Sequence, residues 1–414
     1  MLRRTWLMLA CSLGLAACSV QSETSGRPAG LFPGTSGAPA PASRKVAILL
    51  PLSGPLAAVG QDMLQAAELV LQEPGSPPFQ AYDTMSSPAG AAAAAGRAVA
   101  EGAGIILGPL TASATQAAAP VAHKAEVPML AFTNDDTQAR PGVWVLGITP
   151  SQQVRRLVKA LQSRGKTRVA ALLPENAYGS AMQAAMQAAA SAAGEPPPTI
   201  QTYAPGMASL NEAVRVLSDY ANRRGPIEAE MRAARALETP AGRARMHALN
   251  RQPIPPPPFD ALLLAATGTT LEEISTLLPY YDLNPGAVQV VGPILWQDFS
   301  VRRGAGLAGA WFPAPDPAAR QQFAATYAAK YGASPPFVAD LAFDAAALAR
   351  VLAKGPGYSA TALANPAGFT GADGLLALSP DGQVRRGLAV FQIGPGGAAS
   401  LLDPAPATLA GLGT

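Results

Sequence analysis

Lys45-Val-Ala-Ile-Leu-Leu50 is followed by Pro51-Leu-Ser-Gly54, and then by residues 56–73, whose apolar positions recur at helical spacing. Every position after Lys45 in the first run is apolar, so a strand formed there would be buried on both faces. A buried strand, a short turn and an amphipathic helix are the opening of a strand–helix–strand unit. This stretch therefore predicts a parallel sheet that is covered by helices.

The same unit recurs along the chain in two series. The first series continues with strands predicted over 79–82, 105–107, 127–132 and 143–148 and helices over 89–101 and 113–124. The second series has strands predicted over 168–173, 199–203, 260–266 and 288–292 and helices over 151–163, 178–193, 210–220 and 271–278. Two such series predict an α/β protein with two Rossmann-like lobes, each with a parallel sheet, and a cleft between them.

The pattern changes after the second series. Helices are predicted over 317–331 and 337–353, the latter with Phe337 on its apolar face. Further on, 374–378 and 387–393 flank Ser379-Pro-Asp-Gly382, which has the composition of a tight turn. We expect these two segments to pair as an antiparallel hairpin at a sheet edge.

Residues 1–17 have the features of a bacterial lipoprotein signal peptide. Arg3 and Arg4 precede an apolar segment that is too short to span a membrane as a helix. Leu15-Ala16-Ala17-Cys18 resembles a lipobox, which implies cleavage before Cys18 and acylation of its thiol. Residues 18–43 then read as the lipidated cysteine and a flexible tether rich in Gly, Pro, Ser and Ala. A plain secretory signal with a chance cysteine is the alternative.

Composition excludes several classes of function. The chain has 414 residues, 14% charged residues and a formal net charge of +3, with no long basic run that would indicate nucleic-acid binding. Cys11 lies in the removed segment, so the mature protein would hold only the lipidated Cys18 and no disulfide. The two histidines, His123 and His247, are far apart in the sequence. We therefore expect no metal site, no cofactor and no catalytic residue.

Residues 222–258 interrupt the alternation of strands and helices. The segment is helical in composition, contains seven arginines and ends in Pro255-Pro-Pro-Pro258. We interpret it as an insertion between a helix and a strand of the second series. It forms either a solvated pair of surface helices or a surface for docking a partner.

The order of elements over about 44–395 resembles the type I periplasmic solute-binding proteins of the leucine-binding kind. The opening at 45–73, Gly108-Pro-Leu-Thr-Ala-Ser-Ala-Thr-Gln116 and Val127-Pro-Met-Leu-Ala-Phe-Thr133 carry this resemblance. In that family the chain crosses between the lobes three times. The resemblance implies a first lobe of 44–147 plus 317–356 and a second lobe of 148–316 plus 357–414, with a ligand cleft between them.

A closer resemblance is to penicillin-binding-protein activator lipoproteins, which use the same fold. It rests on the Arg-rich insertion, on 259–267, 288–296 and 309–316, and on Phe369-Thr-Gly-Ala-Asp-Gly374. Amino-acid-binding relatives place a carboxylate-binding Ser where this chain has Ala112. Asp135 and Asp136 after the fourth strand would also repel a carboxylate, although Ser113 and Thr115 remain as possible ligands.

Candidate ligand residues lie after the strands, because ligands of open α/β sheets bind at the carboxyl ends of strands. Ser, Thr and Asp before helices are also ordinary N-caps, and that reading stays open. The candidates are Ser53, Gly54, Gly108, Thr111, Ser113, Thr115, Thr133, Asn134, Asp135, Tyr178, Thr267 and Trp296.

Catalytic motifs give no enzyme hypothesis. Gly165-Lys-Thr167 lacks the earlier glycine of a phosphate loop, and Ser163-Arg-Gly-Lys166 lacks the other motifs of penicillin-recognising enzymes. We therefore expect a non-enzymatic lipoprotein, tethered to the outer membrane and facing the periplasm, whose partner is a peptidoglycan synthase. The alternative is the substrate-binding lipoprotein of an ABC importer, which binds an amino acid or similar solute and contacts a permease.

Overall fold

The computed structural model describes residues 44–283, 286–298, 307–408 and 410. The predicted signal peptide (1–17), Cys18 and the tether (18–43) lie outside the described residues, and their assignment stays a prediction. Within the described residues, no helix combines the length and apolar character that crossing a membrane requires.

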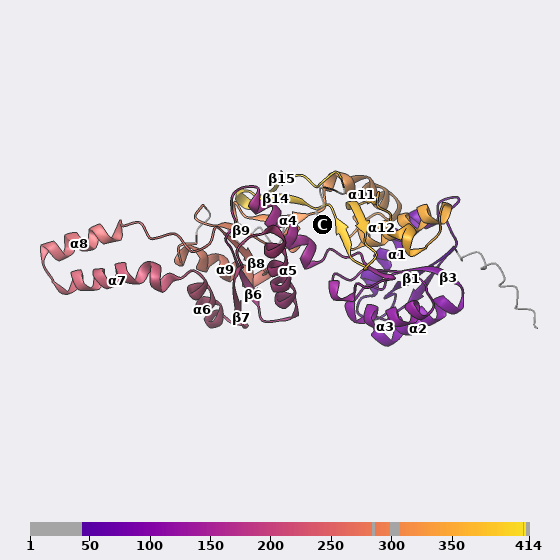
Figure 1. The fold of residues 1–414 in the computed structure, drawn as a ribbon, viewed down its shortest axis with the longest axis horizontal. Helices are drawn as coiled ribbons and strands as arrows, with labels where there is room; N and C mark the ends of the chain where they lie inside the picture. The colour runs from indigo at the N-terminus through magenta and orange to yellow at the C-terminus, as the bar shows by residue number, and fades with distance from the viewer. Residues whose placement is uncertain (1–43, 284–285, 299–306, 409, 411–414) are drawn as a thin grey trace, which may run out of the picture. The chain divides into compact units, whose positions relative to one another are not determined.

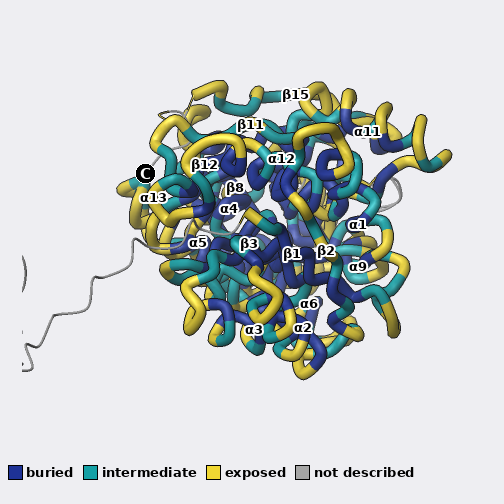
Figure 2. The backbone as a smooth tube through the Cα atoms, turned by 90° about the vertical axis from the view of Figure 1, so that its right-hand side faces the viewer, coloured by how far each residue is buried: buried dark blue, intermediate teal, exposed yellow. Residues whose placement is uncertain are grey.

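The first sheet has five parallel strands in the order β2-β1-β3-β4-β5. Apolar runs form these strands because both of their faces are buried, and Val46 to Leu50 of β1 have no exposed surface. Figure 2 shows β1 and β3 buried beneath helices with exposed outer faces. The strands are β1 (Lys45–Leu50), β2 (Phe79–Asp83), β3 (Ala103–Leu107), β4 (Met129–Ala131) and β5 (Val143–Val145).

Helices cover both faces of this sheet. One core cluster joins it to α1 and α12, and another joins its opposite face to α2 and α3. Side-chain caps start two of the helices, because Ser87 and Thr111 accept hydrogen bonds from backbone N–H groups of the first turn. The helices are α1 (Ala57–Leu71), α2 (Pro88–Ala100), α3 (Ala112–Lys124), α11 (Pro317–Tyr331) and α12 (Ala339–Lys354).

The second sheet has seven strands in the order β15-β14-β10-β9-β8-β6-β7. Its strands from β10 to β7 run parallel, and β14 and β15 add an antiparallel edge. The strands are β6 (Val169–Pro174), β7 (Thr199–Tyr203), β8 (Ala261–Leu264), β9 (Gln289–Val291), β10 (Trp311–Ala314), β14 (Ala389–Ile393) and β15 (Ala399–Asp403).

Helices cover the second sheet in the same way, with α6 and α9 in one core cluster and α4 and α5 in the other. Two short 3-10 helices, η1 (Asp136–Gln138) and η2 (Ile294–Gln297), follow strands of the first and second sheets. The prediction of two Rossmann-like lobes with parallel sheets is confirmed (Figure 1). The covering helices are α4 (Pro150–Gln162), α5 (Ala177–Ala193), α6 (Met207–Leu217) and α9 (Gly268–Tyr280).

The Arg-rich segment forms a helical hairpin, α7 (Tyr220–Ala236) and α8 (Pro240–Asn250), which we call the arm. Figure 1 shows the arm extending away from the second sheet. Its two helices meet through Ile227, Ala234 and Leu249, which are buried. A Cβ at Gly242 would lie 2.3 Å from the carbonyl oxygen of Ala234, so only glycine permits the helices to come this close.

The end of the chain differs from the prediction in its strand pairing. Residues 374–378 form β12, which pairs with β13 (Val384–Arg386) and β11 (Phe369–Gly371) in a separate antiparallel sheet. The expected partner, 387–393, contains β14, which joins β10 of the second sheet instead. The predicted hairpin is therefore wrong in its partner, because the turn at Ser379–Gly382 leads into a short strand before the chain crosses to the other sheet.

The small sheet packs with the first lobe. Leu363 of the short helix α13 (Ala360–Leu363), Leu376, Leu378 and Val384 belong to the core cluster of the first sheet. The expected division placed all of 357–414 with the second lobe. The small sheet instead makes apolar contacts with α12 and β5 of the first lobe. The last crossing of the chain between the lobes therefore lies near residues 387–388 and not at 356–357.

Candidate functional site

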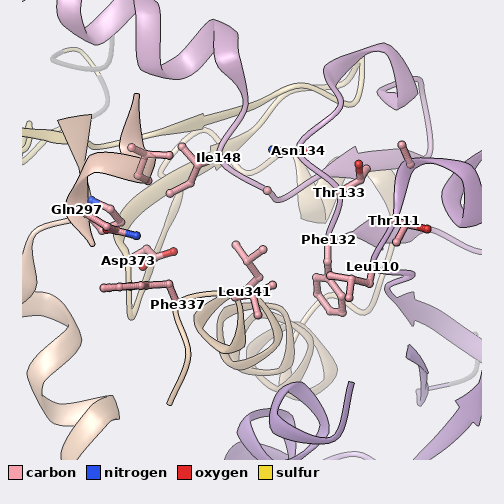
Figure 3. Close-up of a pocket in the computed structure, with 15 residues that line it drawn as sticks. Leu110, Thr111, Phe132, Thr133, Asn134, Ile148, Gln297, Phe337, Leu341 and Asp373 are labelled. Carbon is pink, nitrogen blue, oxygen red and sulfur yellow. The ribbon is translucent and has the colours of Figure 1, made fainter. Parts of the chain in front are cut away.

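A cavity of about 440 Å³ lies between the ends of strands from both sheets. Loops after β3, β4 and β5 form one wall, and residues after β9 and β10 form the other. In Figure 3, Thr111, Thr133 and Phe132 lie on one side of this cavity, across from Gln297, Asp373 and Phe337. The cavity therefore occupies the place where open α/β sheets bind ligands.

Three of the predicted ligand residues line the cavity, namely Thr111, Thr133 and Asn134. Thr111 caps α3, and its Oγ1 accepts a hydrogen bond of 3.3 Å from the backbone N of Ala114. Thr133 Oγ1 accepts from the backbone N of Asp135 at 3.1 Å, and the hydroxyl can still donate. Thr111 and Thr133 thus cap local structure and also line the cavity, so the capping interpretation does not exclude a role in ligand binding.

Ala112 also lines the cavity, at the first residue of α3. A methyl group there offers no hydroxyl to a bound carboxylate. The N-terminus of α3 itself remains as a weaker attraction for an anion, through its dipole and backbone N–H groups.

Ser53 and Gly54 do not line the cavity. Their loop follows β1 and is held against the end of the edge strand β2, where Asp83 Oδ1 accepts from the backbone N of Leu52 at 2.9 Å and of Ser53 at 3.2 Å. Burial acts to raise the pKa of Asp83, but these hydrogen bonds outweigh it and hold the pKa below its usual value. The carboxylate therefore fixes the loop on the side of the sheet away from β4 and β5.

The other first-lobe candidates lie outside the lining of this cavity. Gly108 has a positive φ of 102°, and a Cβ there would lie 2.2 Å from the carbonyl oxygen of Leu49. Thr115 is fully buried and donates to the carbonyl of Thr111 at 2.9 Å, whereas Ser113 is exposed. Asp135 caps η1, where Thr137 Oγ1 donates to it at 2.6 Å. None of these four residues lines the cavity.

The second-lobe candidates Tyr178, Thr267 and Trp296 also lie outside the cavity lining. Trp296 is fully buried, and its indole N–H donates to the carbonyl of Ala266 at 2.9 Å, so it belongs to the core. Tyr178 and Thr267 follow β6 and β8, farther along the sheet than β9 and β10. Burial raises the pKa of Tyr178 to about 12.

Sequence reasoning missed most of the apolar lining, and Asp373 with it. Phe337, Val338 and Leu341 come from the start of α12, which begins two residues after Phe337. Pro335 and Pro336 precede this start, so Phe337 stays outside the helix and is half exposed. Its predicted place on the buried helix face is wrong, and the two prolines were the signal for it.

Asp373 connects the cavity to a buried ionic network. Arg386 Nη1 lies 3.2 Å from Asp373 Oδ2 and 3.1 Å from Asp344 Oδ2, and its Nη2 donates to the carbonyl of Leu146 at 3.1 Å. Asp344 Oδ1 also accepts from the backbone N of Ala372 at 2.5 Å. The network thus ties β13, α12 and the end of β5 together behind the cavity wall.

The carboxyl groups of this network resist ionisation. Burial raises the pKa of Asp344 to about 6, although Arg386 acts in the opposite direction. Burial also raises the pKa of Asp373, against the same opposing effect of Arg386. Asp340, which Arg320 binds at 2.5 Å and 3.0 Å, has a pKa raised by burial as well. A single guanidinium thus faces two desolvated carboxyls.

The cavity is chemically simple. Of the fifteen described residues that line it, Asp373 alone has a titratable side chain, and Thr111, Thr133, Asn134 and Gln297 supply the other polar groups. Within the described residues, no three His, Cys, Asp or Glu side chains are grouped to hold a metal ion. His123 and His247 are both exposed. This arrangement can bind a small, largely apolar molecule with a few polar groups.

Comparisons with known proteins agree with this architecture. A family model described as periplasmic binding protein matches residues 43–219. Among solved structures, a protein described as a branched-chain amino acid ABC transporter from Rhodospirillum rubrum is 18% identical at a TM-score of 0.65, covering 87% of this chain and 100% of that chain. The leucine binding protein LivK from Thermotoga maritima is 18% identical at a TM-score of 0.55, covering 87% and 98%. No curated protein matches by sequence.

Full-length LpoA from Haemophilus influenzae is also similar, with 16% identity and a TM-score of 0.62. The alignment covers 87% of this chain and 59% of LpoA, so this chain spans about three fifths of that protein. Together the matches show that the chain has the type I periplasmic binding protein fold, as its sequence resemblance implied.

Proposed function

We propose that this protein is a non-enzymatic, lipid-anchored protein of the cell envelope that activates a peptidoglycan synthase of the penicillin-binding-protein class by direct contact. The arm is the observation that carries this proposal. Its base packs on the second lobe, and the rest of its two helices stands outside both sheets. The resemblance to penicillin-binding-protein activators and the structural likeness to LpoA support the same class of partner.

The arm holds the net charge of the protein. It contains six arginines and three glutamates, a formal +3 that equals the value for the whole chain. Two of the glutamates are matched within the arm, where Arg245 lies 2.5 Å from Glu230 and Arg224 lies 3.7 Å from Glu228. Among the described residues, no carboxylate pairs with the exposed Arg232, Arg235 and Arg243 around the tip.

The base of the arm is rigid. Arg223 is buried, and its guanidinium donates to the carbonyls of Pro255 at 2.8 Å, Ser218 at 3.0 Å and Tyr281 at 3.3 Å. Tyr220 and Tyr281 pack edge to face beside it, with ring centroids 5.1 Å apart. A fixed base presents the tip in a defined direction, which lowers the entropy lost on binding.

The chemistry of the tip selects an acidic protein surface as its partner. Arginine binds carboxylates with two parallel hydrogen bonds, and the exposed Leu237 at the tip adds an apolar contact, being 61% exposed. The partner that fits is the Asp- and Glu-rich face of a synthase. Anchoring through Cys18, with the 18–43 tether reaching at most about 80 Å, would place the arm in the periplasm.

The test is co-purification from the native host with the full lipidated chain. Wild-type protein should retain detergent-solubilised synthases, and the double variant Arg232→Glu, Arg235→Glu should lose them. Arg97→Glu is the matched control, since Arg97 is an exposed arginine on α2 of the first lobe. Failure of the wild type to retain any synthase would count against the proposal.

The cavity supports a second candidate, the substrate-binding lipoprotein of an ABC importer. The N-terminus of α3 and Thr133 could receive a carboxylate, and Asp373 could receive an ammonium group. Asp373 is poorly prepared for this role, because Arg386 already binds it and burial raises its pKa. A thermal-shift screen of amino acids tests this candidate, because a ligand at one hundred times its Kd stabilises the folded protein by about 2.7 kcal/mol. A clear shift with one amino acid would favour the importer.

A further inference from the structure

The strand β15 forms an edge of the second sheet. In the strand order it lies beside β14 alone, and Figure 2 shows it at the surface. Residues 399–401 are exposed, Leu401 to 53%. Natural sheets usually protect such an edge with charged residues, proline or a covering element. The first four residues of β15, Ala-Ser-Leu-Leu, include neither a charge nor a proline, so this edge can accept a further strand.

The backbone groups of Ala399 and Leu401 point away from the sheet. Ile393 of β14 lies opposite Ala399 and uses its backbone groups on the side of β10. Its N–H donates to the carbonyl of Ala310 at 2.8 Å, and its carbonyl accepts from the N–H of Gly309 at 2.7 Å. Because bonded and non-bonded pairs alternate along an antiparallel ladder, Ala399 and Leu401 direct their N–H and carbonyl groups outward. Among the described residues, no other strand pairs with these groups.

A cavity of about 400 Å³ lies beside this edge. Phe312, Phe391 and Ala399 line it from β10, β14 and β15, and residues of α11 line it from the first lobe. The rings of Phe312 and Phe391 are stacked, with centroids 5.6 Å apart. Phe337 lines both this cavity and the first one, so the two are neighbours. An aromatic or large aliphatic side chain is the group that such a lining accepts.

The edge and the cavity are on the same face of the sheet. Leu401 is paired with Phe391, and cross-strand partners have their side chains on one face. The side chain of Ala399 is on this face as well and lines the cavity. A residue of an added strand opposite Ala399 would have its Cβ about 5 Å farther out. Since Ala399 has only a methyl group, a long side chain from that position can reach the cavity.

The lining of the cavity contains an acid without a countercharge. Asp316 is the N-cap of α11 and accepts from the backbone N of Ala318 at 2.9 Å, and no cation of the described residues pairs with it. Arg320, the one cation among the described lining residues, is already bound to Asp340. Charge complementarity therefore favours an occupant with a lysine or arginine close to its apolar side chain.

We propose that β15 and this cavity bind an extended peptide segment of a partner protein. The segment pairs with β15 as an additional strand and places an aromatic or large aliphatic side chain in the cavity, with a basic residue near Asp316. In recognition at a sheet edge, main-chain hydrogen bonds supply affinity and side-chain pockets supply specificity. The surface is separate from the arm, and the proposal does not depend on a synthase being the partner of the arm.

The test uses the purified full-length protein and a fluorescent synthetic peptide, Thr-Lys-Val-Phe-Val-Lys-Thr, with blocked ends. Its sequence is the same in both directions, so a lysine shares the face of the phenylalanine in either orientation of the strand. Fluorescence anisotropy should show saturable binding. Replacing the phenylalanine by alanine, or methylating the inner backbone nitrogens of the peptide, should weaken binding at least tenfold. Both changes leave the folding of the protein untouched.

Two variants test the protein side. Ala399→Pro removes an outward N–H and no hydrogen bond within the sheet, so it should weaken peptide binding at least tenfold with little change in melting temperature. Asp316→Asn keeps a helix cap and should abolish the preference for the lysine peptide over one with glutamine at both lysine positions. Asp381→Asn is the matched control for this change, because Asp381 is exposed and likewise accepts from a backbone N–H two residues on, and it should keep the preference.

Amide hydrogen exchange followed by NMR tests the pairing directly. In the free protein, the amide of Ser400 should be protected by β14, whereas the amides of Ala399 and Leu401 should exchange fast. Bound peptide should slow the exchange of these two amides at least tenfold.

The proposal is overturned if the phenylalanine and alanine peptides bind alike, or if the methylated peptide binds as tightly as the parent. Unchanged exchange at Ala399 and Leu401 with the peptide bound would overturn it too. So would dimerisation in sedimentation experiments that Leu401→Lys abolishes, because the edge would then belong to a second copy of this chain.

Discussion

Replacing Arg386 by glutamine should destabilise the protein more than any other single loss of charge in the first lobe. Arg386 is the one cation bound to both Asp344 and Asp373 among the described residues, at 3.1 Å and 3.2 Å. The side chains of these three residues are 0%, 1% and 4% exposed. Glutamine keeps some length and hydrogen-bonding capacity, so the change tests the charge.

The expected loss is about 3–5 kcal/mol at pH 7.5, the usual effect of leaving a buried charge without its partner. The two carboxyls already have raised pKa values, and without Arg386 those values rise further. Protonation therefore removes the unpaired buried charge of the variant at low pH. At pH 5 the loss should fall to about half, because the carboxyls are then largely neutral.

Urea denaturation followed by circular dichroism measures this loss at both pH values. Arg97→Gln is the control, since it removes the charge of an exposed arginine on α2 of the same lobe and should leave the stability unchanged. Adding Asp373→Asn to Arg386→Gln should restore part of the stability. A loss below about 1 kcal/mol at pH 7.5, or one that does not depend on pH, would refute the account of the network.

Three further predictions follow from particular residues. The pKa of Asp344 is about 6 in the folded state against an ordinary 3.8, so the folded state binds a proton more tightly than the unfolded state does. The free energy of unfolding should therefore fall as pH rises from 5 to 7. Urea titrations should show this slope, and Asp344→Asn should flatten it. Trp296→Ala should lower the free energy of unfolding by about 3–5 kcal/mol, because it empties a fully buried site and removes the hydrogen bond to Ala266. A loss under about 1 kcal/mol would place Trp296 outside the core. Gly242→Val should separate the two arm helices and speed proteolysis within 220–250 while the lobes stay intact, and unchanged proteolysis would contradict the close contact with Ala234.

The sheets could be predicted from the sequence because their signal is local. The run 45–50 is apolar at consecutive positions, and the following helix has apolar residues at helical spacing, so each element is visible within its own residues. The segment 222–258 was likewise recognisable as helical, and it forms α7 and α8. Periodicity of this kind needs no knowledge of distant partners.

The candidate site was predictable only in part, because which loops face the cavity depends on strand order. Thr111, Thr133 and Asn134 follow β3 and β4, which are central and adjacent, whereas the loop of Ser53 follows β1 and is drawn towards β2 by Asp83. No single segment of the sequence determines the order of the strands.

Long-range ionic contacts could not be predicted from the sequence either. Asp373 lies in a short turn between β11 and β12, and its partner Arg386 follows after another strand and turn. Nothing in the local pattern relates either residue to Asp344 on α12. A charged residue between apolar strands was the one available signal, and it indicates burial with a partner without naming the partner.

The most direct test of the proposed function is the affinity of the full-length protein for purified peptidoglycan synthases of its own host, measured with and without the charges at the arm tip. We predict that one synthase binds the wild type, that the Arg232→Glu, Arg235→Glu variant binds it at least tenfold more weakly, and that Arg97→Glu binds it normally. Equal affinity of the wild type and the tip variant, or the absence of binding to every synthase of the host, would contradict the account.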